Sequence, residues 1–376
     1  MGAGDYRKHP DYRNRCRDLL QYAAPSVRQG VVRMRSSPIT PTVDFDADGE
    51  QHGFLKLPHS HDASAWGAVM IPITVIRHGE GPTVLLTGGN HGDEYEGPIV
   101  LSELAATLRA RDVRGRVIVV PFMNYPAFRA GSRTSPIDRG NLNRSFPGRA
   151  DGSVTEKIAD YFQRHLLPLA DYVLDLHAGG RTLDFVPFAA IHVLPDAAQQ
   201  ARCEAAMLAF GAPYSMRMLE MDSVGLFDTA AEEAGKVFVS TELGGGGTAT
   251  AASIGIARRG VHGLLAHARV LATPAPHGAH GARRTTLLDM PDGRCYTSSE
   301  HDGLLELCKN LGDAVDCGDL IARVHDATRT GVPPIAYHAH RSGLLAARHF
   351  PGLVKMGDTI AVVADIVADS VATAPP

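Results

Sequence analysis

The strongest chemical signal in the sequence is a histidine and a glutamate three residues apart, His91 and Glu94, in the run GGNHGDE. The apolar run TVLLTGG predicts a strand that ends here, and a predicted helix follows. One helical turn would place the imidazole and the carboxylate on the same face, a spacing suited to binding one metal ion. A histidine satisfied by local hydrogen bonds, beside an acid at the start of a helix, is the structural alternative. The pair alone leaves both interpretations open.

A second candidate, Asp175-Leu176-His177, also lies where a predicted strand runs into glycines. His177 could supply the third ligand of a set of two histidines and one glutamate with a position open for water, which is typical of catalytic zinc. Asp175 projects to the same side of the strand and could orient the imidazole of His177. A core histidine is the alternative for an isolated D-L-H motif, but its occurrence together with the first motif favours metal binding.

Two further groups of polar residues predict the other parts of a hydrolytic site. Glu242 ends an apolar strand just before a run of glycines, where a carboxylate is costly to bury unless it is paired or catalytic. It is a candidate general base for an attacking water molecule, and an exposed loop acid is the alternative. Asn143 and Arg144 are suited to binding a substrate carboxylate, and Arg133 could polarise a scissile carbonyl. Three neighbouring arginines are predicted to be solvated loop residues: Arg129, Arg139 and Arg149.

These residues can act together only if the ends of several strands meet, and residues 81–273 show the required pattern. Predicted strands at 83–89, 116–122, 171–177, 189–195 and 236–243 alternate with predicted helices at 98–111, 153–170, 196–210 and an Ala-rich helix ending near residue 273. Ser153 and Glu156 have the spacing of a capping box at the start of the second helix. Such alternation indicates an α/β domain with a parallel or mixed sheet, which binds ligands at the carboxyl ends of its strands.

The remainder of the chain is predicted to contain an N-terminal extension with edge strands (1–80), a turn-rich linker (274–284) and a C-terminal β domain (285–376). The β domain contains an internal repeat, because residues 303–324 and 343–363 share GLL followed by V-x-x-G-D-x-I-A-x-V. Two short β units with matched turns predict a small pseudo-twofold barrel or sandwich, similar to biotinyl and lipoyl carrier domains.

The composition argues against several other classes of protein. The chain has 376 residues, 44% hydrophobic and 21% charged, as in an ordinary globular enzyme. Its formal charge of −4 provides no field that would favour nucleic acid or an anionic membrane. Five scattered cysteines without a C-x-x-C pair argue against a disulfide framework. No apolar run approaches the roughly 20 residues of a membrane helix, and we expect a cytoplasmic protein. Three histidine pairs are predicted to be surface or loop residues: His59 and His61, His277 and His280, and His338 and His340.

The order of the motifs resembles that of the aspartoacylase and succinylglutamate desuccinylase family, a branch of the zinc carboxypeptidase superfamily. H-x-x-E, an arginine followed by N-x-N-R, then D-L-H and T-E-L-G occur in sequence, and the resemblance spans about residues 80–363. It implies a zinc-carboxypeptidase-like central mixed sheet flanked by helices, with a small C-terminal all-β barrel-sandwich domain. It also implies one Zn²⁺ per chain on His91, Glu94 and His177, with Glu242 as base. The substrate carboxylate would then bind Asn143 and Arg144, and the carbonyl oxygen Arg133.

The resemblance implies a zinc-dependent deacylase that hydrolyses the amide of a small N-acyl amino acid. The runs GGNHGDEYEGP, SRTSPIDRGNLNRSFPG and DLHAGG are more similar still to the N-acetyl-diaminobutyrate deacetylases of bacterial ectoine breakdown. The expected reaction therefore converts Nα-acetyl-L-2,4-diaminobutyrate to diaminobutyrate and acetate. A zinc carboxypeptidase, or another hydrolase of aspartoacylase or desuccinylase type, would use the same residues, and only substrate profiling separates these activities.

A carrier or interaction protein built on the β domain is the alternative from a different class. Carrier domains need a lysine in the turn between their two halves to hold the prosthetic group. The segment 325–342 between the repeats contains no lysine, and Lys355 lies within the second repeat. The sequence therefore favours an enzyme with a small-molecule substrate, no nucleic-acid or membrane partner, and a possible homo-oligomeric state.

Overall fold

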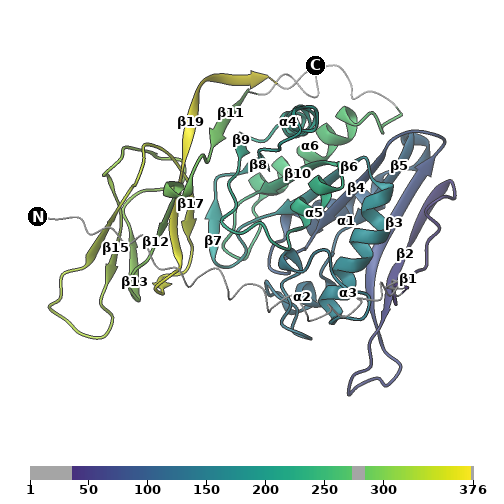
Figure 1. Cartoon of the computed structure of the whole chain (residues 1–376), viewed down its shortest axis with the longest axis horizontal. Helices are drawn as coiled ribbons and strands as arrows, with labels where there is room; N and C mark the ends of the chain where they lie inside the picture. The colour runs from purple at the N-terminus through teal and green to yellow at the C-terminus, as the bar shows by residue number, and fades with distance from the viewer. Residues whose placement is uncertain (1–35, 273–283, 374–376) are drawn as a thin grey trace, which may run out of the picture. The chain divides into compact units, whose positions relative to one another are not determined.

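The computed structural model describes residues 36–272 and 284–373, with the backbone alone from residue 368 (Figure 1). The first 35 residues of the predicted extension, and the predicted linker except for residue 284, lie outside this range. The first strands are β1 (Thr40–Pro41), β2 (Gly49–Pro58), β3 (Ala68–His78), β4 (Thr83–Gly88), β5 (Gly115–Val120) and β6 (Tyr172–His177). They are followed by β7 (Leu183–Phe185), β8 (Phe188–Ile191), β9 (Tyr214–Arg217) and β10 (Val237–Glu242).

Helices connect these strands much as the sequence predicts. The α-helices are α1 (Glu96–Thr107), α2 (Tyr125–Ala130), α3 (Val154–Tyr161), α4 (Ala197–Phe210), α5 (Phe227–Glu233) and α6 (Ala251–His267). Short helical turns occur at Ala110–Asp112, Leu142–Arg144, Phe162–Leu166, Leu167–Leu169 and Gly293–Cys295. The capping box of Ser153 and Glu156 is confirmed at the start of α3. Two helices end earlier than predicted: Leu108 becomes extended and packs in the core after α1, and Arg269 adopts φ 56° after α6.

The central strands are buried on both faces because helices cover each side. Leu86, Val119 and Leu174 pack with α1, α4 and α6, which form one layer. The residues before them, Leu85, Ile118 and Val173, point to the opposite face and pack with α3 and α5. Figure 1 shows the helices beside the central strands. Burial on both faces explains why these strands are continuous apolar runs rather than alternating ones.

The strand order is β1-β2-β3-β5-β4-β6-β10-β8-β9, and the path continues into the C-terminal strands. β4 is parallel to β5 and β6, and β6 is parallel to β10, whereas β3 and β8 join this group antiparallel. The predicted mixed sheet is therefore confirmed. The pairing register places Thr87 opposite Asp175, and His177 opposite Glu242. Parallel strands thus bring residues from distant parts of the sequence to one edge of the sheet.

The C-terminal repeat forms two matched units of three strands. The first unit contains β13 (Gly303–Leu307), β14 (Ala314–Val315) and β15 (Leu320–His325), and the second β17 (Gly343–His349), β18 (Leu353–Val354) and β19 (Thr359–Thr373). β13 pairs with β15 and with β18, whereas β17 pairs with β19 and with β14. The short middle strand of each unit therefore pairs with the first strand of the other unit, which gives the predicted pseudo-twofold arrangement.

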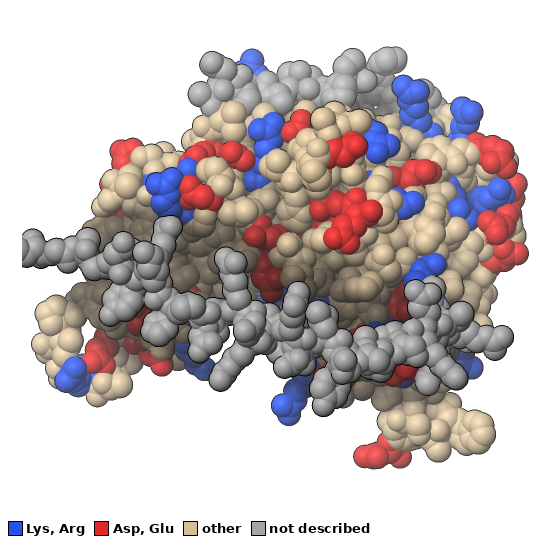
Figure 2. Space-filling view, viewed as in Figure 1, with Lys and Arg blue, Asp and Glu red and all other residues tan. Residues whose placement is uncertain are grey.

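The C-terminal strands also continue the central sheet. β11 (Arg284–Asp289) is parallel to β9 and antiparallel to β19, and β12 (Tyr296–Ser298) pairs with β19. β16 (Ile335–His338) completes the smaller sheet beside β15. Within the described residues, no helix is long and apolar enough to cross a membrane. On the face shown in Figure 2, acidic and basic side chains are interspersed, in keeping with the small net charge.

Candidate active site

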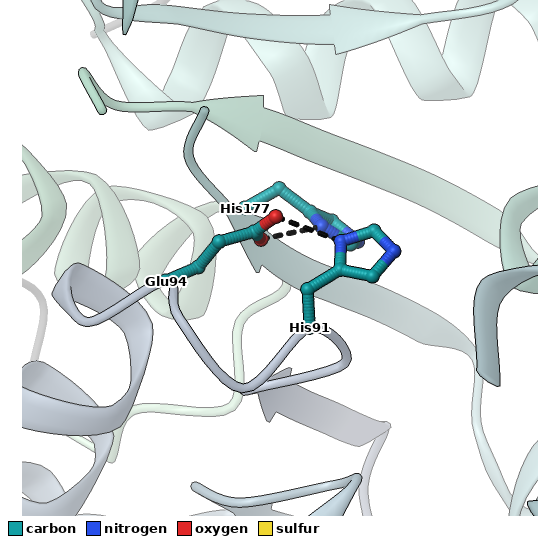
Figure 3. Close-up of side chains that lie close together, drawn as sticks. All are labelled: His91, Glu94 and His177. Carbon is teal, nitrogen blue, oxygen red and sulfur yellow. Dashed lines mark hydrogen bonds and ion pairs between the residues drawn. The ribbon is translucent and has the colours of Figure 1, made fainter. Parts of the chain in front are cut away.

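His91, Glu94 and His177 form a compact buried cluster (Figure 3). His91 and Glu94 lie in the turn between β4 and α1, and His177 ends β6. The Nδ1 atom of His91 is 2.7 Å from Oε1 of Glu94, and Nδ1 of His177 is 2.9 Å from Oε2. One ligand atom from each residue lies within 4.8 Å of the others. The expected helical turn at 91–94 is instead a tight turn before α1, but it brings the two side chains together as predicted.

Gly92 shows why this turn needs a residue without a side chain. A Cβ atom at this position would lie 2.0 Å from the carbonyl carbon of Ala127 in α2. The Gly92 amide also donates to the carbonyl oxygen of Ser132 at 3.0 Å. Because backbone packs directly on backbone here, the turn is held in one place, and with it His91 and Glu94 on either side.

Asp175 fixes the orientation of His177 from behind. Its Oδ2 atom accepts hydrogen bonds from Nε2 of His177 at 2.7 Å and from Nδ2 of Asn90 at 3.0 Å. Its Oδ1 atom accepts from the hydroxyl of Thr87 at 2.7 Å. Because Nε2 of His177 is bonded to this carboxylate, Nδ1 is the nitrogen that faces Glu94. The aspartate therefore stands where an orienting partner of a metal-binding histidine is usually found.

The electrostatics of the cluster favour a positive charge among these groups. Burial alone would lower the pKa of His177, but Asp175 and Glu94 raise it well above its usual value. Burial likewise opposes ionisation of Glu94, yet the two imidazoles hold its pKa below the usual range. Burial lowers the pKa of His91, which favours its neutral form. A metal ion binds the neutral imidazole, so it would take the place of the proton on His177. Two imidazole nitrogens and one carboxylate match the protein ligands of catalytic zinc, so these residues fit a metal ion.

Glu242 ends β10 directly opposite His177 in the parallel pairing of β10 and β6. Its Oε2 atom is buried and has no hydrogen-bond partner within the part of the chain that the structure describes. Burial, followed by the nearby charge of Glu94, raises the pKa of Glu242 well above its usual value. A carboxyl group with a raised pKa beside a reaction centre is suited to accepting a proton and returning it.

All seven predicted site residues line one cavity of about 290 Å³. Arg133 is partly exposed, and its Nη1 atom lies 3.6 Å from Oε1 of Glu94. Asn143 accepts a hydrogen bond from the Phe227 amide at 2.9 Å through Oδ1, which orients its side chain. The exposed Arg144 donates from Nη1 to the Asn143 carbonyl oxygen at 2.6 Å. The three arginines predicted to be solvated are exposed and are not among the residues that line the cavity: Arg129, Arg139 and Arg149.

Several residues that complete this cavity were not expected from the sequence. Glu220 follows β9, Asp228 lies in α5, and Tyr296 comes from β12 in the C-terminal part of the chain. None of them belongs to a motif with recognisable spacing, so no local signal marks them. Of the predicted surface histidines, His61, His338 and His340 are exposed and His59 is half-buried. The pair at positions 277 and 280 lies outside the described residues.

Residues 80–268 match the family model described as the succinylglutamate desuccinylase/aspartoacylase catalytic domain. The chain belongs to this family, which confirms the resemblance inferred from the order of its motifs. It is thus an enzyme of the deacylase class.

Individual relatives are similar over almost their whole length. The chain is 61% identical to the N-alpha-acetyl-L-2,4-diaminobutyric acid deacetylase of Halomonas elongata, covering 89% of this chain and 97% of that protein. The product-bound structure of the ectoine utilization protein EutE (DoeB) from Ruegeria pomeroyi is 62% identical with a TM-score of 0.85, covering 88% of this chain and 99% of that one. A succinylglutamate desuccinylase/aspartoacylase from Rhodobacter sphaeroides is 38% identical with a TM-score of 0.82, covering 88% and 100%.

Proposed function

We propose that this protein is a zinc-dependent deacylase that hydrolyses Nα-acetyl-L-2,4-diaminobutyrate to diaminobutyrate and acetate. The observation that carries the chemistry is the strand register, which sets Glu242 beside His177 in a cavity shared with Glu94 and His91. The choice of substrate is supported by the 61% identity to the Halomonas elongata deacetylase.

One Zn²⁺ per chain would be held by His91, Glu94 and His177. When bound, such an ion supplies Lewis acidity toward the substrate carbonyl and lowers the pKa of water. Asp175 would keep His177 in the orientation that presents Nδ1 to this position, because Nε2 is hydrogen-bonded to it at 2.7 Å. We propose that residues 81–273 form the hydrolase domain that contains all of these groups. Residues 285–376 would form a β domain that completes the wall of the cavity.

The other residues perform the proton transfers and hold the substrate. Glu242 takes a proton from the attacking water as the carbon–oxygen bond forms, and donates it to the leaving nitrogen as the amide bond breaks. Arg133 stabilises the negative charge that develops on the carbonyl oxygen. Asn143 and Arg144 bind the α-carboxylate, because the Asn143 amide nitrogen has no hydrogen-bond partner among the described residues and Arg144 presents a guanidinium to the same cavity.

The test combines metal analysis with a substrate panel. The purified protein should contain one equivalent of zinc and release acetate from Nα-acetyl-L-2,4-diaminobutyrate faster than it cleaves N-acetylaspartate, N-succinylglutamate or C-terminal peptides. In Glu242→Gln, kcat should fall by about 10²–10⁴-fold with the zinc content unchanged, because only the proton acceptor is lost. Glu233→Gln removes the same charge from an exposed position on α5 and is the matched control. A Glu242→Gln variant with near wild-type activity would refute the assigned base, and preference for peptides would refute the substrate.

A further inference from the structure

Two carboxylates that line the cavity, Glu220 and Asp228, have no part in the mechanism above. Asp228 is only 7% exposed, and its Oδ1 atom accepts hydrogen bonds from the amide and the hydroxyl of Thr229. Its Oδ2 atom accepts no hydrogen bond within the described residues. Glu220 makes no hydrogen bond or ion pair in the same part of the chain. The cavity therefore contains carboxylate oxygens that accept no hydrogen bond among the described residues, on the buried Asp228 and the half-buried Glu220.

The positive and negative charges around Glu220 and Asp228 do not balance. Nδ1 of His192 is 3.0 Å from Oε2 of Glu232, and its Nε2 is 3.9 Å from Oδ2 of Asp228. Burial opposes a charge on His192, but Glu232 and Asp228 raise its pKa to about 9. One atom each from His192, Glu220 and Asp228 lies within 4.8 Å of the others. A single imidazolium thus faces three carboxylates, and one more cation in the cavity would be stabilised.

The acidic pair is tied structurally to the residues proposed to bind the α-carboxylate. The amide of Phe227, the residue before Asp228, donates to Oδ1 of Asn143 at 2.9 Å. On the other side, the hydroxyl of Tyr296 donates to the carbonyl oxygen of Leu219 at 2.6 Å and so holds the segment that carries Glu220. Asn143 and Tyr296 both line the cavity. These two contacts therefore fix the acidic end of the cavity relative to the end proposed to bind the α-carboxylate.

We propose that Glu220 and Asp228 bind the side-chain ammonium of the substrate and so restrict the enzyme to N-acyl amino acids with a short cationic side chain. This inference rests on the proposed deacylase function and identifies the residues that select the substrate. An α-carboxylate at Asn143 and Arg144 together with an ammonium at Asp228 matches the two charges of an Nα-acylated diamino acid. A neutral side chain would leave Glu220 without a partner among the described residues and Asp228 with His192 alone, and an acidic side chain would be repelled.

The test compares Nα-acetyl-L-2,4-diaminobutyrate with Nα-acetyl-L-norvaline, in which a methyl group replaces the ammonium. Wild-type kcat/KM should favour the cationic substrate by at least about 100-fold. Asp228→Asn and Glu220→Gln should each lower kcat/KM for the cationic substrate by about 10–100-fold and change the value for the norvaline substrate by less than about threefold. Glu233→Gln, the exposed charge change on the same helix, should alter neither value. Equal losses on both substrates would overturn the proposal, since they indicate a structural role.

Binding of the product L-2,4-diaminobutyrate, measured by calorimetry on the zinc-loaded protein, tests the subsite without turnover. Each variant should weaken binding of L-2,4-diaminobutyrate at least about tenfold more than it weakens binding of L-norvaline. If the protein hydrolyses none of the acyl amino acids but still shows this pattern, the proposed function fails while the cationic subsite stands. Unchanged binding in both variants would overturn the subsite. A second equivalent of zinc that disappears in Asp228→Asn would also overturn it, because the cluster would then be a metal site.

Discussion

Replacing Asp175 with asparagine should weaken metal binding while leaving the fold intact. The asparagine oxygen can take the place of Oδ2 and accept the hydrogen bonds that now come from His177 and Asn90. Its amide group can then donate to the hydroxyl of Thr87, which can turn its own hydrogen toward the carbonyl oxygen of Leu174, 3.3 Å away. Every hydrogen bond is thus retained, and only the negative charge behind His177 is lost.

The size of the effect on zinc affinity follows from the loss of the negative charge of Asp175. Removing an orienting partner of a metal-binding histidine typically lowers metal affinity by about 10–100-fold, or about 1.4–2.7 kcal/mol. Asp175→Ala should be more severe, because Nε2 of His177 and Nδ2 of Asn90 would lose their buried acceptor. Each unsatisfied buried donor costs about 1–3 kcal/mol, so this variant should also lose about 2–6 kcal/mol of folding free energy.

Zinc affinity would be measured by competition with a chromophoric chelator at pH 7.5, and the free energy of unfolding by urea denaturation in excess EDTA. The expected order of zinc affinity is wild type, then Asp175→Asn, then Asp175→Ala. Without metal, Asp175→Asn should be destabilised less than Asp175→Ala, because it loses the charge that raises the pKa of His177 but keeps the buried hydrogen bonds. Zinc affinity of Asp175→Asn within twofold of the wild-type value would refute the orienting role. A loss of metal-free stability in Asp175→Asn as large as that in Asp175→Ala would refute the hydrogen-bond rearrangement.

Three further changes have defined outcomes. Gly92→Ala should lower unfolding stability by about 1–3 kcal/mol and reduce zinc content, because the new methyl group meets the backbone of Ala127; a wild-type melting temperature and zinc content would contradict this. His192, with a pKa of about 9 in the folded protein and about 6.5 unfolded, contributes stability that is complete below pH 6.5 and lost as the pH rises through 9. Between pH 6 and pH 10, the free energy of unfolding in urea should therefore fall by up to about 3 kcal/mol more in the wild type than in His192→Gln. Parallel pH profiles of the two proteins would disprove the assignment. Ser153→Ala should cost about 1 kcal/mol in the same assay, since its hydroxyl accepts from the Glu156 amide at the start of α3, and unchanged stability would argue against the cap.

Much of the fold could be predicted because the signals are local. Each of β4, β5, β6 and β10 contains an uninterrupted apolar run, and the Ser153 capping box is complete within four residues. Predictions of helix ends were less successful, because ends depend on tertiary packing: Leu108 leaves α1 to fill the core rather than extend the helix. The sequence repeat predicted two β units, but not the exchange of β14 and β18 between them, which depends on pairing across the repeat.

The sequence by itself determined which residues form the proposed reaction centre. His91, Glu94, His177 and Glu242 each stand at the end of an apolar strand beside glycines, a pattern that is visible without coordinates. Only the tertiary structure decided what else shares their cavity. Glu220 and Asp228 belong to no motif. Hydrogen bonds of the residues next to them hold them in the cavity wall, from the Tyr296 hydroxyl to the Leu219 carbonyl oxygen and from the Phe227 amide to Asn143. The physical reason is that ligand chemistry is specified by residue types in short motifs at the ends of strands, whereas the charge and shape of a cavity depend on side chains brought together from several chain segments.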